Sequence, residues 1–392
     1  MLYKGLSMVK LKVEFKPVVD NFVFRLHYKY TYTIFMVCVV LTTLYDVVGN
    51  QIDCMNPMAE AEEDVAEAFK EVVDAYCFIM GTFTVERHHV PTKELEYHSI
   101  PHPGVGPMKR DDPVIHHAYY QWVPFVLLIQ GVLFYMPHWI WKLFEGGMFK
   151  NVIQNLSVKD YLGAGKGIRN YFTRETQYEA LSKFIRHHMK NQRSWALKFF
   201  FCEFLNLGVV IGMIFFTNWF LGGEFLNYGA SVIEILGQDP ENRTDPMSRV
   251  FPKMTKCIFK TFGSSGTIQI HDVMCLIATN IINEKIYVFL WVWLIILTAV
   301  TSIWFIGRLL TIVLPPFRNF LLKSYVKETR RGDLFIILGQ HSTLSEWLLL
   351  IQLARNMDKT VFSDFIHDFA QDLFHTTATL RADDVRKRKL LS

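Results

Sequence analysis

The sequence predicts an all-α membrane protein: a four-transmembrane-helix subunit with two disulfide-linked extracellular loops and a helical cytoplasmic domain. Three observations predict this class. Four apolar runs are each long enough to cross a bilayer, which takes about 20 apolar residues. Of the nine tryptophans, all but Trp347 lie in or beside these runs, where the indole ring favours the membrane interface. Lysine and arginine are distributed unequally between alternate connecting segments. A soluble protein with four buried core helices is the alternative, but such runs with flanking bases are rare there.

The four runs divide the 392 residues into nine segments. In chain order these are an N-terminal cytoplasmic segment (1–29), the first span (30–48), the first extracellular loop (49–118), the second span (119–141), a cytoplasmic loop (142–195), the third span (196–221), the second extracellular loop (222–285), the fourth span (286–314) and a C-terminal cytoplasmic helical region (315–392).

The distribution of bases predicts the orientation. Residues 1–29, 144–195 and 315–392 together carry 27 lysines and arginines, against 11 in the two remaining loops. Cytoplasmic segments of membrane proteins are enriched in these residues. Both termini and the middle loop are therefore predicted to be cytoplasmic, and the two long loops to face outward.

The cysteines agree with this orientation. Cys54 and Cys77 lie in the first outer loop, and Cys257 and Cys275 lie in the second. An even number of cysteines on an oxidising side predicts two disulfides, and four cysteines allow three pairings. Asn242 begins an Asn-Arg-Thr sequence in the second loop and is a glycosylation candidate on the same side.

The stretch between Cys54 and Cys77 is strongly acidic, although the whole chain has a formal net charge of +4. Asn56-Pro57 is a helix start signal, and the spacing predicts a helix over residues 58–76. Its predicted packing face is apolar and consists of Val65, Ala68, Phe69, Val72, Val73 and Tyr76. The other face presents acids: Glu60, Glu63, Glu67, Glu71 and Asp74. On a lone soluble helix such a face is commonly just solvated.

Ionisable residues also occur within or at the ends of the spans. Asp46, Glu203 and Arg308 have such positions, where ionisable side chains often face a pore or each other. For Asp46 and Arg308, extension of the side chain to the membrane interface is an equally open alternative. In the tail, helical periodicity over residues 344–374 predicts helices that pack on each other and on the middle loop. The final "RKRKLL" is a basic end suited to lipid headgroups.

The second span, "YYQWVPFVLLIQGVLFYMPHWIWK", is the most individual part of the sequence. Pro137 lies near its inner end and is predicted to kink the helix. Here the chain resembles the innexins, the gap-junction channel proteins of invertebrates, whose signature is YYQWV at this position. The five signature residues are Tyr119, Tyr120, Gln121, Trp122 and Val123.

Further segments look like innexin segments, among them "NFVFRLHYKYT", "FFFCEFLNL", "GEFLNYG" and "GSSGTIQIHDVMC". The resemblance covers residues 18–372 in collinear order, with two cysteines in each outer loop. Three departures stand out. The family commonly has cysteine where Pro124 stands, residues 1–17 match little, and the segment between Cys54 and Cys77 is longer than usual.

The resemblance implies a large-pore gap-junction or hemichannel subunit that passes ions and small metabolites between adjacent cells or across the plasma membrane. Its implied partners are further copies of itself in a ring of eight, a docked ring on the neighbouring cell, other innexins and membrane lipids. The implied location is the plasma membrane at cell junctions. The resemblance implies neither enzymatic activity, nor a cofactor, nor binding of nucleic acid.

The resemblance also implies site residues. It pairs Cys54 with Cys275 and Cys77 with Cys257. It places the N-terminal segment in the pore as a funnel, with Met1, Lys4, Lys10 and Lys12 as lining candidates. Around such a ring, we expect Glu60, Glu63 and Glu67 to form a negative vestibule that concentrates cations, and to be weak candidates for binding Ca²⁺.

Two other classes of function share some of these features. A four-span adhesion or scaffold protein of cell junctions, without channel activity, shares the predicted topology. An enzyme needs a site, and six histidines crowd the first outer loop: His88, His89, His98, His102, His116 and His117. Their spacing is irregular and includes no HExxH helix, which disfavours a metal site. The "LGAGKG" stretch lacks the spacing of a phosphate-binding loop.

Overall fold

A computed structural model describes part of the chain. The described residues are 19–55, 63–89, 102–109, 111–149, 182–183, 185, 194–235, 246–325, 343–357, 359 and 362–371. The chain forms two compact units. We call Leu26–Met136 with Asn206–Thr301 the disulfide unit, and Met1–Arg25 with Pro137–Leu205 and Ser302–Ser392 the terminal unit.

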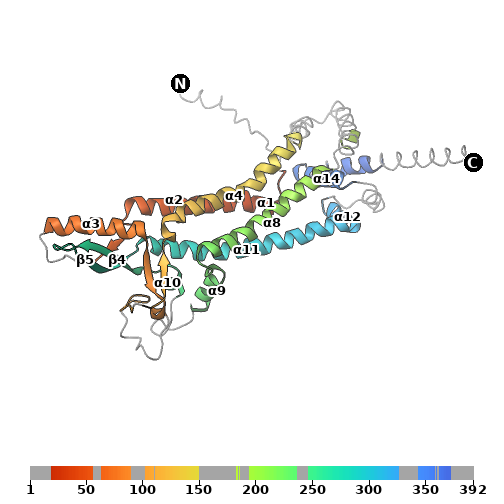
Figure 1. Ribbon diagram of the computed structural model, residues 1–392. Helices are drawn as coiled ribbons and strands as arrows, with labels where there is room; N and C mark the ends of the chain where they lie inside the picture. Colours follow the sequence, from red (N-terminus) through yellow and green to blue (C-terminus); the bar gives the residue numbers. More distant parts are fainter. Residues whose placement is uncertain are drawn as a thin grey trace, which may run out of the picture. The chain divides into compact units, whose positions relative to one another are not determined.

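Four helical stretches in the described residues are long and apolar enough to cross a membrane (Figure 1). The first is Phe22–Val48 and comprises α1 (Phe22–Arg25), the π-helical η3 (Leu26–Thr31) and α2 (Tyr32–Val48). The second comprises the 3-10 helix η6 (Tyr119–Trp122) and α4 (Val123–Glu145), and α4 continues past Pro137. The third is α8 (Ser194–Phe220) and the fourth is α11 (Thr279–Val313). The predicted four-span class is confirmed.

The first of these helices begins before the predicted residue 30. Arg25, His27 and Lys29 interrupt the apolar run, so hydropathy placed the start too late. In the structure His27 is fully buried, and its Nε2 lies 2.8 Å from the Thr301 hydroxyl. A polar residue with a buried partner therefore continues the helix where the hydropathy pattern stops.

The two loops together form a five-stranded antiparallel sheet in the order β1-β5-β4-β2-β3. The strands are β1 (Asp53–Cys54), β2 (Thr82–Val85), β3 (Val114–His117), β4 (Met254–Phe262) and β5 (Ile268–Leu276). The first loop contributes β1, β2 and β3, and the second contributes the β4–β5 hairpin. The sheet was not part of the predicted all-α class. Two short helices, α9 (Phe225–Ile235) and α10 (Pro246–Val250), also lie in the second loop.

The disulfide unit has two hydrophobic clusters. One fills the space between the membrane-crossing helices and includes Phe35, Leu127 and Leu290. The other lies under α3 (Glu63–Met80) in the loops, and it contains all four disulfide cysteines with Val73 and Phe259. Each cluster removes apolar surface from its surroundings, so the loops have a core of their own beyond the helices.

The terminal unit contains α12 (Pro315–Lys323), α14 (Leu344–Asn356) and a helix over residues 362–371. Thr343 begins α14 with a capping box, in which its hydroxyl accepts from the Glu346 N–H and the Glu346 carboxylate accepts from the Thr343 N–H. The Trp347 indole donates to the Arg318 carbonyl at 3.1 Å. The described parts of the tail run, α14 and residues 362–371, are thus helical, and α14 packs on α12.

Candidate functional site: the disulfide-braced loops

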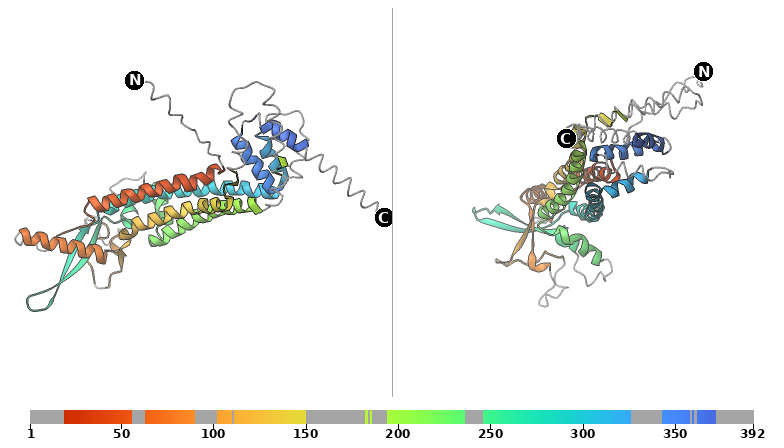
Figure 2. Two further views of the ribbon diagram at one scale, coloured as in Figure 1. Left: turned by 90° about the horizontal axis from the view of Figure 1, so that it is seen from above. Right: turned by 90° about the vertical axis from the view of Figure 1, so that its right-hand side faces the viewer.

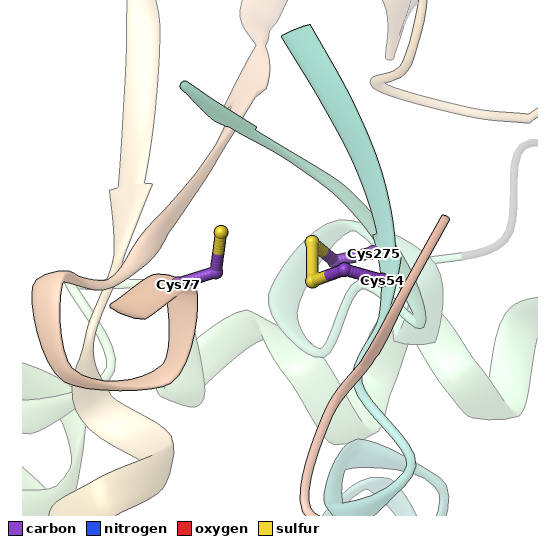
Figure 3. A group of neighbouring side chains, drawn as sticks. All are labelled: Cys54, Cys77 and Cys275. Atoms are coloured by element: carbon purple, nitrogen blue, oxygen red, sulfur yellow. A yellow bond between two sulfur atoms is a disulfide. The ribbon is translucent and has the colours of Figure 1, made fainter. Parts of the chain in front are cut away.

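Two disulfides join the first loop to the second. They link Cys54 to Cys275 and Cys77 to Cys257, the pairing that the resemblance implies. Register explains the first bridge, because β1 pairs with β5 and sets Cys54 directly opposite Cys275 (Figure 3). The sulfur atoms of Cys54, Cys77 and Cys275 lie within 4.8 Å of one another, and all three belong to the two bridges.

Helix α3 covers the bridges. Val73 and Cys77 are fully buried, and the Phe69 and Tyr76 rings contact the Phe259 ring of β4 edge-on at centroid distances of 5.7 and 5.0 Å. Such aromatic pairs contribute about 0.5–1.5 kcal/mol beyond their buried area. The helix is therefore fixed on the hairpin by packing as well as by a covalent bond.

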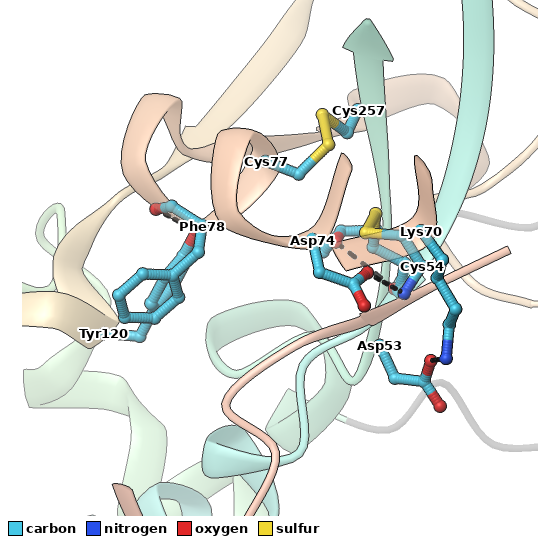
Figure 4. The surroundings of a disulfide bond; sticks show 10 residues. Asp53, Cys54, Lys70, Asp74, Cys77, Phe78, Tyr120 and Cys257 are labelled. Atoms are coloured by element: carbon cyan, nitrogen blue, oxygen red, sulfur yellow. Dashed lines mark hydrogen bonds and ion pairs between the residues drawn. A yellow bond between two sulfur atoms is a disulfide. The ribbon is translucent and has the colours of Figure 1, made fainter. Parts of the chain in front are cut away.

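Polar contacts fix the other side of α3 (Figure 4). The Cys54 N–H donates to the Asp74 carboxylate at 2.7 Å, and Lys70 Nζ lies 2.6 Å from the Asp53 carboxylate. Burial raises the pKa of Asp74, while the hydrogen bond to Asp53 raises the pKa of Lys70. The Lys70 pair is exposed and contributes little to stability, whereas Asp74 fixes the backbone beside a bridge.

The predicted packing face of this helix is only partly right. Phe69, Val73 and Tyr76 pack as expected, but Val65, Ala68 and Val72 are exposed. The helical spacing places all six residues of the predicted face on one broad side of α3. The hairpin covers only half of that side. Helix α3 therefore has a packed face, an acidic face and an exposed apolar face.

On the predicted acidic face, Glu67 and Glu71 are exposed and Asp74 is half-buried, while Asp64, which the prediction did not include, is also exposed beside them. Of the three candidate cation residues, only the Glu67 side chain is described. Glu60 lies outside the described residues, and Glu63 is described only as the first residue of α3. Met1, Lys4, Lys10, Lys12 and Asn242 also lie outside the described residues.

The YYQWV signature joins the loops to the second membrane helix. The Tyr119 hydroxyl donates to the Val250 carbonyl at 3.0 Å, which ties it to the second loop. The Tyr120 hydroxyl donates to the Phe78 carbonyl at 3.4 Å, and the Gln121 amide donates to the carbonyls of Phe78 and Ile79. These carbonyls belong to the last turn of α3, where helix carbonyls lack partners within the helix.

The other two signature residues have different surroundings. Val123 is 1% exposed and belongs to the core between the membrane helices, whereas Trp122 is 59% exposed. The sequence identified the motif only through its resemblance. Its structural role could not be read from the residues, because the partners of its donors are backbone atoms of distant segments.

Histidines form a buried group beside the sheet. The Thr84 hydroxyl lies 2.8 Å from His117 Nε2 and 3.0 Å from His89 Nε2. One hydroxyl can donate to one ring and accept from the other, so the Nε2 atoms of two neutral rings both have a partner. Burial lowers the pKa of His117 to about 4 and also lowers the pKa of His89. Among the candidate histidines, His98 lies outside the described residues.

A second polar group lies in the terminal unit. Arg308 Nε lies 2.8 Å from Glu203 Oε2, and the Trp304 indole donates to Glu203 Oε1 at 3.1 Å. Both side chains are buried, so Glu203 and Arg308 face each other inside the protein. The guanidinium also lies over the rings of Trp304 and Phe200 at 5.1 and 5.4 Å.

The same carboxylate holds the start of the first membrane helix. The Asn21 amide donates to Glu203 Oε1, while the Asn21 side-chain oxygen accepts from the Phe24 N–H at 2.6 Å. Asn21 thus caps α1 and is itself held by α8. Asp46, the third ionisable residue noted in the sequence, is half-buried in the disulfide unit and lines a crevice with Thr42 and Thr279.

Comparisons with known proteins find relatives along nearly the whole chain. The family model described as Innexin matches residues 20–373. Innexin inx2 of Schistocerca americana is 37% identical over 356 residues, which cover 91% of this chain and 93% of that protein. Innexin shaking-B of Drosophila melanogaster is 37% identical over 358 residues, 91% of each chain. Innexin inx2 of Drosophila melanogaster is 36% identical over 364 residues, 93% of each.

Proposed function

This chain belongs to the innexin family and is a subunit of gap-junction channels or hemichannels, and we propose that eight copies form its ring and that two rings dock between adjacent cells. The observation that carries this proposal is the pair of disulfides between the two loops. A sheet built from both loops, with two bridges and a helix packed over them, is a rigid rim. Docking needs such a rim because two preformed surfaces then meet without the cost of ordering either one.

The proposed orientation places both termini and the middle segment in the cytoplasm and the braced loops outside. Two observations support it. Bases are concentrated in the terminal and middle segments. Disulfides persist on the oxidising side of a membrane, and all four paired cysteines lie in the two loops. Glycosylation of Asn242 belongs to the same proposal and serves as a marker of the outer side.

The acidic face of α3 is proposed to line the mouth of the pore. Asp64, Glu67 and Glu71 are exposed and close together on one helix. Repetition around a ring multiplies their field, and a vestibule of one charge sign concentrates counter-ions. We assign the cation preference of the channel to Glu60, Glu63 and Glu67, and include weak Ca²⁺ binding in this assignment.

The N-terminal segment is proposed to line the pore, with Met1, Lys4, Lys10 and Lys12 as its lining residues. The support from the described residues is the anchor at its end. Asn21 is buried, caps α1 and is bonded to Glu203. A segment that enters a pore needs such a fixed point where it meets its first membrane helix.

The ring is tested by imaging the purified complex in projection. We expect eight subunits around one axis, and passage of a small dye into liposomes that contain the complex. A pore-free monomer that never permeabilises liposomes would contradict the channel and favour an adhesion role. Replacing Glu60, Glu63 and Glu67 together by glutamine tests the vestibule separately. Unchanged cation preference and unchanged calcium sensitivity in that variant would reduce α3 to a spacer.

A further inference from the structure

Helix α3 has an apolar surface that its own chain leaves exposed. The α3 stripe consists of Val65, Ala68, Val72, Ala75 and Ile79. These positions alternate by three and four residues, the spacing of a helix face that packs against a partner. Val65 and Val72 are each 56% exposed and Ile79 is 70% exposed. Since α3 belongs to a loop outside the four membrane-crossing helices, lipid does not account for this surface.

The β4–β5 hairpin carries a second exposed apolar surface. The hairpin face consists of Lys260, Phe262, Ile268 and Ile270. Phe262 pairs with Ile268 and Lys260 pairs with Ile270, so the four side chains lie on the same face of the hairpin. Phe262 is 81% exposed, Ile268 is 62% exposed and Ile270 is 66% exposed. The hairpin extends away from the rest of the sheet (Figure 2), which leaves this face accessible.

The opposite face of the same hairpin shows that a helix can cover a face of this hairpin. Phe259 and His271 alternate with the residues of the hairpin face, and they contact Phe69 of α3 at ring distances of 5.7 and 6.4 Å. One face of the hairpin therefore packs under a helix. The other face is covered near its base, where Lys256 is buried and pairs with Asp272, and is exposed at its outer end. Large exposed apolar surfaces beside packed ones mark contacts with a partner.

We propose that the α3 stripe of one subunit packs on the hairpin face of the next subunit in the same ring. This inference rests on the proposed function, since it assumes that copies of the chain assemble around an axis. A ring needs two different surfaces that fit each other, because each subunit meets one neighbour with each side. The two surfaces fit this requirement. Each hairpin is then held between its own α3 and the α3 of its neighbour.

Charge favours a second copy of this chain as the partner that covers the hairpin face. Lys260 lies on the hairpin face, is exposed and forms no ion pair among the described residues. Asp64, Glu67 and Glu71 lie along one edge of the α3 stripe and also lack ion pairs within the described part of the chain. Lys260 of one copy thus meets the acidic edge of the next, which sets the register of the contact.

The test joins the two surfaces with a new disulfide. One tagged copy carries Val72→Cys and a second, differently tagged copy carries Ile270→Cys. The two copies are expressed together, and rings are purified from a single membrane so that no opposing ring is present. Mild oxidation is expected to yield a dimer that contains both tags. A matched control replaces Val72→Cys by Lys70→Cys, which lies away from the stripe, and we expect about tenfold less dimer because the effective concentration is lower.

A charge exchange supplies a readout that does not depend on cysteine. Lys260→Glu is expected to reduce the fraction of protein in rings several-fold on size-exclusion chromatography, and adding Glu71→Lys is expected to restore it. Intact wild-type rings without the mixed-tag dimer would overturn the inference and leave the proposed function standing. A dimer found only when two rings are docked would assign the contact to docking and overturn the in-ring contact. Failure of the unmodified chain to form rings would overturn both proposals.

Discussion

The disulfide unit and the terminal unit join distant segments by different means. In the disulfide unit, bridges connect residues that are 221 and 180 positions apart, and a sheet and a packed helix surround them. In the terminal unit, one carboxylate on α8 binds Asn21, which precedes α1, and Trp304 and Arg308 of α11. The first arrangement is covalent, and the second depends on the complementary charges of one buried pair.

This difference indicates which unit tolerates a substitution that alters charge. A disulfide holds its segments whatever their charge, so it suits a surface that must keep its shape. A buried ion pair is stable only while both partners are present, because a lone buried charge is strongly destabilising. The terminal unit is thus the one in which a single altered charge has a large effect.

The largest expected effect comes from breaking a bridge. Cys54→Ser or Cys275→Ser removes the link that aligns β1 with β5, and loss of a native disulfide commonly costs about 2–5 kcal/mol. We expect no electrical coupling between paired cells that express either variant. Cys38→Ala, which alters a cysteine outside the bridges, is the control and retains coupling. Normal junctional currents in both serine variants would contradict a role for this bridge.

The second largest effect is expected from the buried ion pair of Glu203 and Arg308. Glu203→Gln leaves the Arg308 guanidinium buried without a counter-charge, and we expect a loss of about 3–5 kcal/mol in the free energy of unfolding. Thermal unfolding of the solubilised protein measures it. The double variant Glu203→Gln with Arg308→Met removes both charges and is expected to recover most of the loss. If the double variant is no more stable than the single one, the pair is not what holds these segments.

Low pH is expected to reduce the stability of the disulfide unit without breaking its disulfides. The pKa of His117 in the folded loop is about 4, below its ordinary value of 6.5, because the ring is buried. Protons therefore bind more readily to the opened loop. Stability is complete above about pH 6.5 and falls as the pH drops toward 4, by on the order of 3 kcal/mol. Melting temperatures measured across this range test the effect.

The matched control for the acid effect is His117→Gln combined with His89→Gln. Glutamine retains polar atoms near the Thr84 hydroxyl but does not titrate. The double variant should lose most of the dependence on pH between 6.5 and 4. An equal dependence in the variant and the unmodified chain would assign the acid effect to other groups.

The smallest effect is expected at the signature. Tyr120→Phe removes one hydrogen bond to the Phe78 carbonyl, and we expect a loss of about 1 kcal/mol in stability. Trp122→Phe alters an exposed neighbour and should change stability by less than about 0.5 kcal/mol. Denaturant titration of both variants measures the difference. Equal stability of the two would mean that the Tyr120 hydroxyl is not needed at this joint.

The features predicted from the sequence are those that single segments carry. Apolar length identified the four membrane helices, and cysteine positions with the family resemblance supplied the bridges. The start of the first helix was missed because the partner of His27, Thr301, lies in the last membrane helix. Glu203 and Arg308 were noted as facing a pore or each other, and only the structure decided between these alternatives.

The sheet was missed for a similar reason. Alternating residues run through β4 and β5, and "GSSG" between them is a turn sequence. These strands were not predicted, because β1 and β2, which flank the hairpin in the sheet, come from the other loop. The exposed half of α3 was missed because periodicity identifies an apolar side but does not measure how wide its partner is.

The bridge between Cys54 and Cys275 closes the segment between these two residues into a covalent loop. Cys54 follows the end of α2 closely, and Cys275 precedes the start of α11 closely, so the bridge between them encloses the second and third membrane helices. The bridge from Cys77 to Cys257 is nested inside this loop. A protease that cuts once between Cys77 and Cys257 therefore leaves the two halves connected through two bonds. The fragments migrate together until a reducing agent is added, and only then do the two ends of the protein separate.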